Sequence, residues 1–342
     1  MEKTQARLGR PDFVWGISGH NCGYAAYPAE FLEQQVRLAA ELGVDVYRIN
    51  TTPTDEAGFD YLDKVVDLCD KYGLKVFLIV FDCCLHDGSQ PPEFYYQHVK
   101  AIAERYKDRI PMIQISNEQD IPGLDLDTYK DPDGDLPKYY DMQRYPLIRD
   151  RMAAMLRAVK EAAPAMERVV NFSWKHYGIL DMFLADGLEW DSTAIDWYSN
   201  MDDLADVRPI LEHLFAMPQK AVYVAEGNHW WGDYLVSEAR QVEYLTEAMK
   251  RFSSVPNDKM KGYMIYELLD EPAHEWGESH FGLVKNDIRG HIGAPKLAYA
   301  AVQKLLRGNA AALDGDSAAT QELYNSMFDG QAVIGKTGDR DG

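Results

Sequence analysis

Two glutamates stand out because each ends a largely apolar run. Glu118 ends the run MIQISNE, and Glu226 ends the run AVYVAE. Two carboxyl groups about 5–5.5 Å apart can cleave a glycosidic bond, because one attacks the sugar carbon while the other moves the proton. We therefore expect Glu118 and Glu226 to form such a pair. The proton donor of the pair should lie in a less polar setting, where its pKa rises and keeps it protonated for the first step.

Three further residues have side chains that would support this pair. Asn117 precedes Glu118, and its amide can hydrogen-bond a sugar 2-hydroxyl in the transition state. Arg48, in the run VYRIN, can place a cation beside Glu226 and keep that carboxylate ionised. Tyr198, in the run IDWYS, can donate its hydroxyl to Glu226. The alternatives are an arginine bonded to a neighbouring loop and a tyrosine packed in the core.

Aromatic and polar residues close to the ends of the apolar runs are candidates for substrate binding, because sugars present apolar faces that stack on aromatic rings. Core or loop packing is the alternative for each of them taken alone. The candidates are His20, Asn21, His86, Trp174, His229, Trp230, Tyr266 and Trp276.

Eight apolar runs alternate with segments of helical periodicity, and this alternation predicts strands and helices in turn. The runs are apolar on both faces, as in VFLIVF, which is typical of parallel strands covered by helices. Gly43, Gly73 and Gly187 follow helical segments, at positions where a left-handed residue ends a helix. The predicted strands span residues 13–21, 44–52, 74–83, 110–120, 167–175, 192–200, 220–230 and 260–272.

Eight βα units in 342 residues favour a single α/β domain, a closed (β/α)8 TIM barrel, over an open doubly wound sheet. The active site of such a barrel lies at the carboxyl ends of its strands, so Glu118 and Glu226 should face one pocket from opposite sides. We expect residues 1–308 to form the barrel and residues 309–342 a peripheral or disordered tail. The polar segment 121–144 should wall one side of the pocket, with its tyrosines available to sugars.

The strand ends Asn117-Glu118 and Glu226 resemble those of clan A of the glycoside hydrolases, and the resemblance extends over residues 12–308. The closing segments YMIYELLDE, FGLV and PKLAY are similar to the end of family 39 enzymes, with family 5 as the next nearest pattern. The resemblance implies a retaining glycoside hydrolase that acts on an oligo- or polysaccharide. It also implies a sugar-binding role for Asn117, an acid/base role for Glu118 and a nucleophilic role for Glu226.

The chain departs from the clan A pattern at two positions. Tyr266 stands where clan A enzymes often have a tryptophan, and the run around Tyr198 lacks the histidine that many members have there. These departures affect the subfamily and the identity of the sugar, and leave the two carboxylates untouched.

The composition is acidic, with a formal net charge of -20, and its 46% of hydrophobic residues can supply a large core. Such a surface repels nucleic acid and anionic membranes and suits a neutral or cationic substrate, with simple solubility as the alternative explanation. The carbohydrate substrate that we expect as partner is implied by the resemblance. No apolar run reaches the length of a membrane span. The N-terminus MEKTQARLGRPD lacks the apolar core of a signal peptide, which indicates a cytoplasmic protein as the chain stands. A secreted protein with its leader removed would look the same.

Two other function classes can use the same barrel. A metal-dependent hydrolase needs histidines and carboxylates clustered at strand ends, such as an HxH pair on the first strand, and the sequence has no such pair. The acidic groups within 267–271 and 125–127 are better explained as solvated or capping carboxylates, so we expect no metal and no cofactor. The cysteines also lack zinc-ligand spacing and are Cys22, Cys69, Cys83 and Cys84.

The remaining alternative is a barrel that binds glycans without cleaving them. Its signature would be the loss of Glu118 or Glu226, and the sequence retains both.

Overall fold

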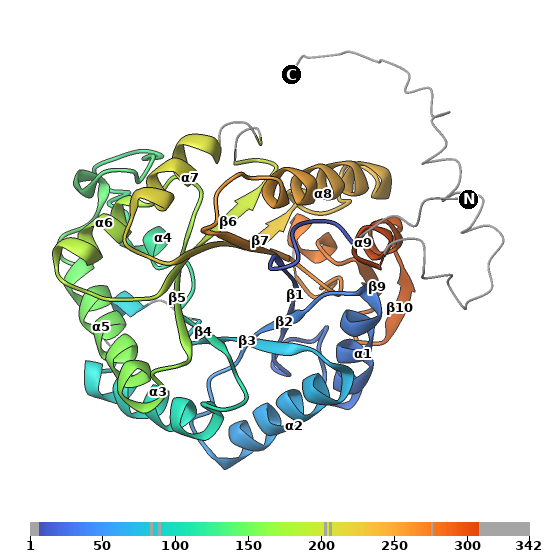
Figure 1. Ribbon diagram of the computed structural model, residues 1–342, viewed down its shortest axis with the longest axis horizontal. Coiled ribbons are helices and arrows are strands. Elements are labelled where there is room, and N and C mark those ends of the chain that lie inside the picture. Colours follow the sequence, from blue (N-terminus) through green and yellow to red (C-terminus); the bar gives the residue numbers. More distant parts are fainter. Residues whose placement is uncertain are drawn as a thin grey trace.

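The computed structural model describes residues 7–82, 85–87, 90–201, 204, 207–274 and 276–307. Within these residues, eight parallel strands close into a barrel in chain order, and helices surround it (Figure 1). The fold is a (β/α)8 TIM barrel, as predicted. The strands are β1 (Val14–His20), β2 (Val46–Asn50), β3 (Lys75–Val80), β4 (Met112–Ile115), β5 (Glu167–Ser173), β6 (Ser192–Tyr198), β7 (Ala221–Asn228) and β8 (Met260–Ile265).

Each strand lies inside one of the predicted ranges, and the helices lie between them. The helices are α1 (Leu32–Leu42), α2 (Glu56–Tyr72), α3 (Pro92–Tyr106), α4 (Asp120–Gly123), α5 (Tyr145–Ala162), α6 (Gly178–Ala185), α7 (Val207–Ala216), α8 (Glu238–Ser253) and α9 (Leu297–Arg307). Short 3-10 turns are η1 (Ala29–Phe31), η2 (Leu85–Asp87), η3 (Pro137–Tyr139) and η4 (Trp276–His280), and a small antiparallel pair is β9 (Val284–Asn286) with β10 (Ile292–Pro295).

The helix ends follow from local residue chemistry. α2 begins after Asp55, whose carboxylate accepts a hydrogen bond from the Gly58 amide at 2.8 Å. Gly43 and Gly73 cap α1 and α2 with φ values of 95° and 76°, and Gly187 after α6 has φ 79°. This left-handed backbone favours glycine, and it confirms the predicted helix ends.

The core has two parts, on either side of the barrel wall. The larger part packs between the strands and the surrounding helices. The smaller part fills the barrel interior from inward-facing strand positions, and it consists of Val46, Phe77, Met112, Val169, Ala194, Ala221, Tyr223, Ala225 and Met264.

On four of these strands, the residue two positions after the apolar, inward-facing residue is polar. Residues two apart on a strand share a face, so the polar side chains lie directly above the apolar ones. The apolar layer therefore forms a floor for a buried polar layer at the carboxyl end of the barrel. The polar residues are Arg48, Gln114, Asn171 and Asp196, which are 1%, 0%, 4% and 0% exposed.

Glu226 enters this polar layer through a shift in the register of β7. Ile195 pairs with Val224, yet the next residue of β6, Asp196, pairs with Glu226, so β7 has one extra residue at Ala225. Ala225 faces the interior, and strict alternation would turn Glu226 outward. The extra residue acts as a bulge that turns Glu226 toward the barrel axis.

The described chain ends at residue 307, so the predicted tail 309–342 lies outside the described residues, as do Cys83 and Cys84. Cys69 is a buried free thiol, whereas Cys22 is exposed. Among the described residues, no helix has the length and apolar character that crossing a bilayer requires.

Candidate active site

A cavity of about 400 Å³ opens at the carboxyl ends of the strands. Both predicted catalytic carboxyl groups face it, and so do six of the eleven residues predicted to bind substrate. These eight residues are His20, Arg48, Asn117, Glu118, Tyr198, Glu226, Trp230 and Tyr266.

Glu226 is held by one hydrogen bond to each of its carboxylate oxygens. Arg48 Nη1 donates to Oε1 at 2.9 Å, and the Tyr198 hydroxyl donates to Oε2 at 2.7 Å. Glu226 is 7% exposed, and Arg48 is fully buried. A buried carboxylate with a cation on one oxygen and a hydroxyl on the other is fixed in position.

Arg48 also connects Glu226 to the neighbouring strands. Its Nη2 donates to Gln114 Oε1 at 2.9 Å and to Asn117 Oδ1 at 3.2 Å, and its Nη1 lies 3.3 Å from Ser18 Oγ. The planar guanidinium can reach these partners at once because its donors point in fixed and different directions.

Asn117 has a side-chain oxygen that accepts three hydrogen bonds. The donors are Gln114 Nε2 at 2.7 Å, Asn171 Nδ2 at 2.8 Å and Arg48 Nη2 at 3.2 Å. The orientation of the amide is therefore set by its surroundings: the oxygen faces the buried donors, and the Nδ2 group is the part left for a ligand.

Glu118 occupies a strained stretch of backbone at the end of β4. Its φ is 42° and that of Ser116 is 60°, a region that side chains with a Cβ rarely adopt. Two contacts hold this conformation. Ser116 Oγ donates to the Phe81 carbonyl at 2.7 Å, and the Glu118 amide donates to Asn171 Oδ1 at 3.1 Å.

The electrostatic setting of Glu118 differs from that of Glu226. Burial, followed by the charges of Glu226 and Asp120, raises the pKa of Glu118 to about 8, while contacts with Ser173 and Asp196 act in the opposite direction. Burial also raises the pKa of Asp196, and the charges of Glu226 and Glu118 add to this effect. The three neighbouring carboxyl groups cannot all ionise easily, so the cavity retains a proton near neutral pH.

Asp196 and Asn171 belong to this site although the sequence analysis did not select them. Asn171 Nδ2 lies 2.7 Å from Asp196 Oδ2 and 2.8 Å from Asn117 Oδ1. The Asn171 amide therefore contacts both the Asp196 carboxyl group and Asn117, the candidate sugar-binding residue. The signal that could have found them is a polar residue at an inward-facing position two places beyond a small or apolar one, as in the run VVNFS.

Tyr266 and Trp230 line the cavity on the β7 and β8 side. The Trp230 ring lies edge-on to Tyr198, with 5.5 Å between ring centroids, and the Tyr266 hydroxyl lies 3.2 Å from His20 Nε2. These two side chains therefore provide aromatic surface next to the groups that hold Glu226.

Four predicted substrate-binding residues lie outside the cavity lining. The Asn21 side chain accepts from the Gly23 amide at 2.8 Å and donates to the Asn50 carbonyl on β2 at 2.9 Å, and the His229 imidazole bonds the Gly232 carbonyl at 3.0 Å. The Trp174 ring packs against Lys175 and His176, and His86 lies in η2. Their place close to a strand end predicted the correct rim of the barrel, whereas the side chains of Asn21, Trp174 and His229 contact neighbouring residues instead of lining the cavity. The side chain of Trp276 lies outside the described residues.

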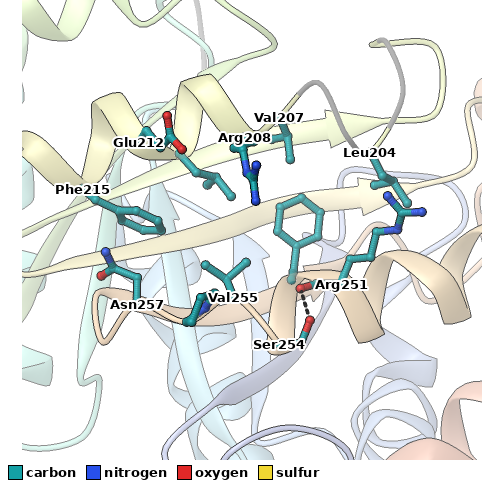
Figure 2. Close-up of a pocket in the computed structure, with 12 residues that line it drawn as sticks. Leu204, Val207, Arg208, Glu212, Phe215, Arg251, Ser254, Val255 and Asn257 are labelled. Carbon is teal, nitrogen blue, oxygen red and sulfur yellow. Dashed lines mark hydrogen bonds between the residues drawn. The ribbon is translucent and has the colours of Figure 1, made fainter.

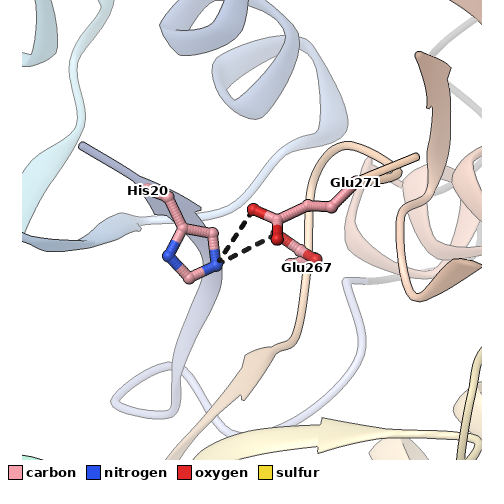
Figure 3. Close-up of side chains that lie close together, drawn as sticks. All are labelled: His20, Glu267 and Glu271. Carbon is pink, nitrogen blue, oxygen red and sulfur yellow. Dashed lines mark ion pairs between the residues drawn. The ribbon is translucent and has the colours of Figure 1, made fainter. Parts of the chain in front are cut away.

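Two carboxylates after β8 lie close to His20 at the edge of the cavity (Figure 3). His20 Nε2 is 3.2 Å from Glu267 Oε2 and 3.7 Å from Glu271 Oε1. Glu267 and Glu271 are 1% and 4% exposed, so the prediction that they are solvated is wrong. The third acidic residue of that segment, Asp270, instead pairs with Lys296 at 2.7 Å. Burial raises the pKa of Glu271 to about 8.

The segment 121–144 contains α4 and η3, and only Ile121 of this segment lines the cavity. Tyr140 is buried, with its hydroxyl 2.7 Å from the carbonyls of both Gly134 and His176. The expectation that Tyr140 is available to sugars is therefore wrong. Its hydroxyl instead ties the segment to the connection after β5 through the His176 carbonyl.

A larger hollow of about 560 Å³ lies outside the barrel, along α7 and the end of α8 (Figure 2). Apolar side chains such as Phe215 and Val255 line most of it, with Arg208 and Arg251 at its side and Glu212 as the one carboxylate among its described lining residues. Its described lining has no pair of carboxyl groups, so the smaller cavity is the one that matches the predicted site.

Solved structures with a similar fold include glycosidases. The family 1 β-glucosidase from Thermotoga maritima aligns over 88% of this chain and 99% of its own, with 12% identity and a TM-score of 0.65. The virulence factor SghA from Agrobacterium tumefaciens aligns over 87% of this chain and 97% of its own, with 15% identity and a TM-score of 0.65. A complex of SghA with its substrate analog salicin has a TM-score of 0.63. At these identities the similarity shows the fold, which resembles that of glycosidases.

No protein-family model matches the sequence, and no curated protein matches it significantly. The finer resemblance to family 39 or family 5 therefore stays a prediction.

Proposed function

We propose that this chain is a retaining glycoside hydrolase in which Glu226 is the nucleophile and Glu118 the acid/base. One observation carries the proposal: two carboxyl groups face the same cavity in opposite electrostatic settings. Glu226 is paired with Arg48 and Tyr198, whereas burial raises the pKa of Glu118 to about 8. An ionised nucleophile beside a protonated acid is what the first step of double displacement needs.

In the first step, a Glu226 oxygen attacks the anomeric carbon and the bond from that carbon to the departing oxygen breaks. Glu118 gives its proton to that oxygen, so the leaving group departs as a neutral alcohol. Asn117 Nδ2 donates to the sugar 2-hydroxyl, a contact that strengthens as positive charge develops on the ring. Arg48 and Tyr198 keep the attacking carboxylate in position.

In the second step, Glu118 takes a proton from a water molecule as that water attacks the same carbon. The bond between Glu226 and the sugar breaks, which returns the carboxylate to its ion pair with Arg48. Two inversions give net retention at the anomeric carbon.

The substrate class follows from the cavity and from the similar folds. Trp230 and Tyr266 offer aromatic surface on which a sugar ring can stack. SghA binds its substrate analog salicin, and the Thermotoga maritima enzyme is a β-glucosidase, which supports a carbohydrate substrate here. We propose an oligo- or polysaccharide rather than one named sugar.

A screen with aryl glycosides and polysaccharides tests the proposal, using wild type beside Glu226→Gln and Glu212→Gln. Glu212 provides a matched control, because it is a glutamate of the outer hollow (Figure 2). Wild type and Glu212→Gln should hydrolyse the same substrate at rates within about twofold, and Glu226→Gln should lose about 10⁴-fold or more. Proton NMR of the first-formed product should show retention.

Inversion at the anomeric carbon would contradict the double displacement. Binding of glycans by wild type without any turnover would instead support the non-catalytic barrel.

A further inference from the structure

Three potential metal ligands converge at the edge of the cavity, from the end of β1 and the segment after β8 (Figure 3). They come from His20, Glu267 and Glu271, and one ligand atom of each residue lies within 4.8 Å of the other two. The residues are 6%, 1% and 4% exposed. Buried carboxylates of this kind are costly unless a positive charge lies between them.

The neighbouring Asn50 determines the tautomer of His20, that is, which ring nitrogen carries the proton and which has the lone pair. Asn50 Nδ2 donates to Asp82 Oδ2 at 2.8 Å, and Asn50 Oδ1 accepts from the Asn21 amide at 3.2 Å. The atom that lies 3.2 Å from His20 Nδ1 is therefore an acceptor, Asn50 Oδ1, so Nδ1 carries a proton and donates it. In the neutral imidazole, Nε2 then presents its lone pair to Glu267 and Glu271.

A lone pair facing two carboxylates is repulsive, so the three atoms need a positive charge or a proton between them. One possibility is a proton on Nε2, which would make an imidazolium. Such a proton can be donated to Glu267 Oε2, which lies 3.2 Å from Nε2, but Glu271 Oε1 lies 3.7 Å away and is beyond hydrogen-bond distance. Glu271 Oε1 is buried and has no hydrogen-bond partner among the described residues. The imidazolium therefore leaves one buried carboxylate oxygen unsatisfied.

A metal ion at the centre would satisfy all three atoms. Ligand atoms about 2.0–2.1 Å from a tetrahedral zinc ion lie roughly 3.3–3.4 Å apart. The separations from His20 Nε2, 3.2 Å to Glu267 Oε2 and 3.7 Å to Glu271 Oε1, lie on either side of this value. One imidazole nitrogen with two carboxylate oxygens favours a transition-metal ion over magnesium or calcium, which prefer oxygen ligands.

Each candidate ligand also has a partner that orients it. The Tyr27 hydroxyl donates to Glu267 Oε2 at 2.7 Å, and His274 Nε2 lies 2.9 Å from Glu271 Oε2. Together with the bond from His20 to Asn50, these contacts form the outer shell that metal-binding side chains usually have.

We propose that His20, Glu267 and Glu271 bind one divalent transition-metal ion of the zinc class, with an open coordination position toward the cavity. His20 and Glu271 line the same cavity as Glu226, so the open position faces the space proposed for the sugar. The ion would bind a hydroxyl group of the sugar there and orient the ring. The contact between the ion and the sugar rests on the proposed glycosidase function, whereas binding of the ion does not.

Titration of untagged, chelator-treated protein with Zn²⁺ in a calorimeter tests the site, and Co²⁺ absorption reports the coordination. Wild type should bind one equivalent of Zn²⁺, and Co²⁺ should give the intense visible bands of a four-coordinate ion. Glu271→Gln and His20→Gln should weaken binding by about 100-fold or more. Glu212→Gln is the matched control, because Glu212 is a glutamate of the outer hollow, and its affinity should stay within about twofold.

Thermal unfolding separates loss of the site from loss of the fold. Zn²⁺ should raise the Tm of wild type and of Glu212→Gln, and should leave the Tm of a folded Glu271→Gln unchanged. Glu226→Gln should lose hydrolysis but keep the wild-type affinity for Zn²⁺. A failure of the proposed glycosidase function is therefore distinguishable from a failure of the proposed metal site. The proposal is overturned if wild type shows no saturable binding of Zn²⁺ or Co²⁺, or if Glu271→Gln binds as tightly as wild type. It is also overturned if the His20 ring is an imidazolium whose NMR signals do not respond to Zn²⁺.

Discussion

Arg48 and Glu226 form an ion pair of 2.9 Å in which the arginine side chain is 1% exposed. Two buried charges in contact are costly to separate, because the survivor loses both its partner and its access to water. Arg48 also donates to Gln114 and Asn117, so its position determines those of the candidate nucleophile and the candidate sugar-binding residue. The pair therefore organises the polar layer that lines the cavity.

Replacing Arg48 by methionine should damage stability as well as activity. It leaves the Glu226 carboxylate buried without its cation, which should cost about 3–5 kcal/mol in the free energy of unfolding. It should also lower kcat/KM by at least about 100-fold, because the nucleophile becomes easier to protonate. Urea unfolding and steady-state kinetics measure the two effects. Arg109→Met is the control: this surface arginine pairs with Asp67 and Asp70, and its loss should cost less than about 1 kcal/mol.

The hydroxyl of Tyr198 should contribute to catalysis more than to folding. Tyr198→Phe removes the 2.7 Å bond to Glu226 Oε2 and leaves the ring in place. A hydrogen bond to a charged group contributes about 1.5–3 kcal/mol, which corresponds to roughly a 10- to 100-fold loss in kcat/KM. Tyr223→Phe offers a matched control at the barrel floor, where the hydroxyl bonds Glu167 at 3.3 Å. Equal losses in the two variants would show that the effect comes from the barrel and not from the nucleophile.

The alkaline limb of the pH–rate profile should reflect Glu118. The first step needs its protonated form, so kcat/KM should fall as the pH rises through about 8. The charge of Glu226 is the second cause of the raised pKa, after burial, so Glu226→Gln should lower the pKa of Glu118. Carbon NMR of the labelled carboxyl groups measures that shift directly. An unchanged Glu118 pKa in Glu226→Gln would mean that the two groups are not electrostatically coupled.

The same shift predicts a pH dependence of stability. Folding raises the pKa of Glu118 from about 4.3 in the unfolded chain, so the folded state binds the proton more tightly. The stabilisation is complete below the unfolded pKa and is lost as the pH rises through about 8. Between pH 6 and pH 9 the free energy of unfolding should therefore fall less for Glu118→Gln than for wild type, in urea titrations at each pH. A steeper fall for the variant would reverse the assigned sign.

The barrel was predictable because its signals are local. Alternating apolar runs and helical segments define all eight strands, and glycine at a helix end needs no tertiary contact to adopt its conformation. Glu118 was predictable from its strand for the same reason. Glu226 was selected at the correct strand end, yet its inward direction depends on the extra residue at Ala225, and simple alternation from the floor of the barrel would have excluded it.

The surroundings of the cavity were harder to predict because they depend on contacts between distant segments. His20 and Glu271 are 251 positions apart in the sequence, and neither residue type alone indicates that they meet. Trp174 and His229 follow strands as a sugar-binding residue would, but the loops turn their rings toward neighbouring side chains and carbonyls. Strand ends indicate which rim a residue occupies, and loop conformation determines where its side chain points.

Tyr140 allows a test of what the segment after β4 does. Tyr140→Phe removes a buried hydroxyl from two carbonyls, so it should lower the free energy of unfolding by about 1–2 kcal/mol and leave kcat/KM within about twofold. Tyr139→Phe is the control, since Tyr139 packs its partly exposed ring against Tyr129 and Lys138. A selective loss of activity on long substrates in Tyr140→Phe would instead show that the Tyr140 hydroxyl takes part in substrate binding.

Azide rescue should separate the roles of the two glutamates. Glu226 attacks carbon, so Glu226→Ala should abolish turnover of every substrate, however good its leaving group. Glu118 protonates the departing oxygen, and an aryl leaving group of low pKa hardly needs that proton, so Glu118→Ala should still form the glycosyl intermediate on such substrates and accumulate it.

Azide needs no deprotonation before it attacks, so it should release the intermediate of Glu118→Ala as the glycosyl azide of retained configuration. In Glu226→Ala, azide can occupy the space of the missing carboxylate and give the inverted azide. Proton NMR of the azide products distinguishes the two configurations. The opposite pattern would mean that the two roles are exchanged. Full activity of both variants without azide would show that neither residue takes part in catalysis.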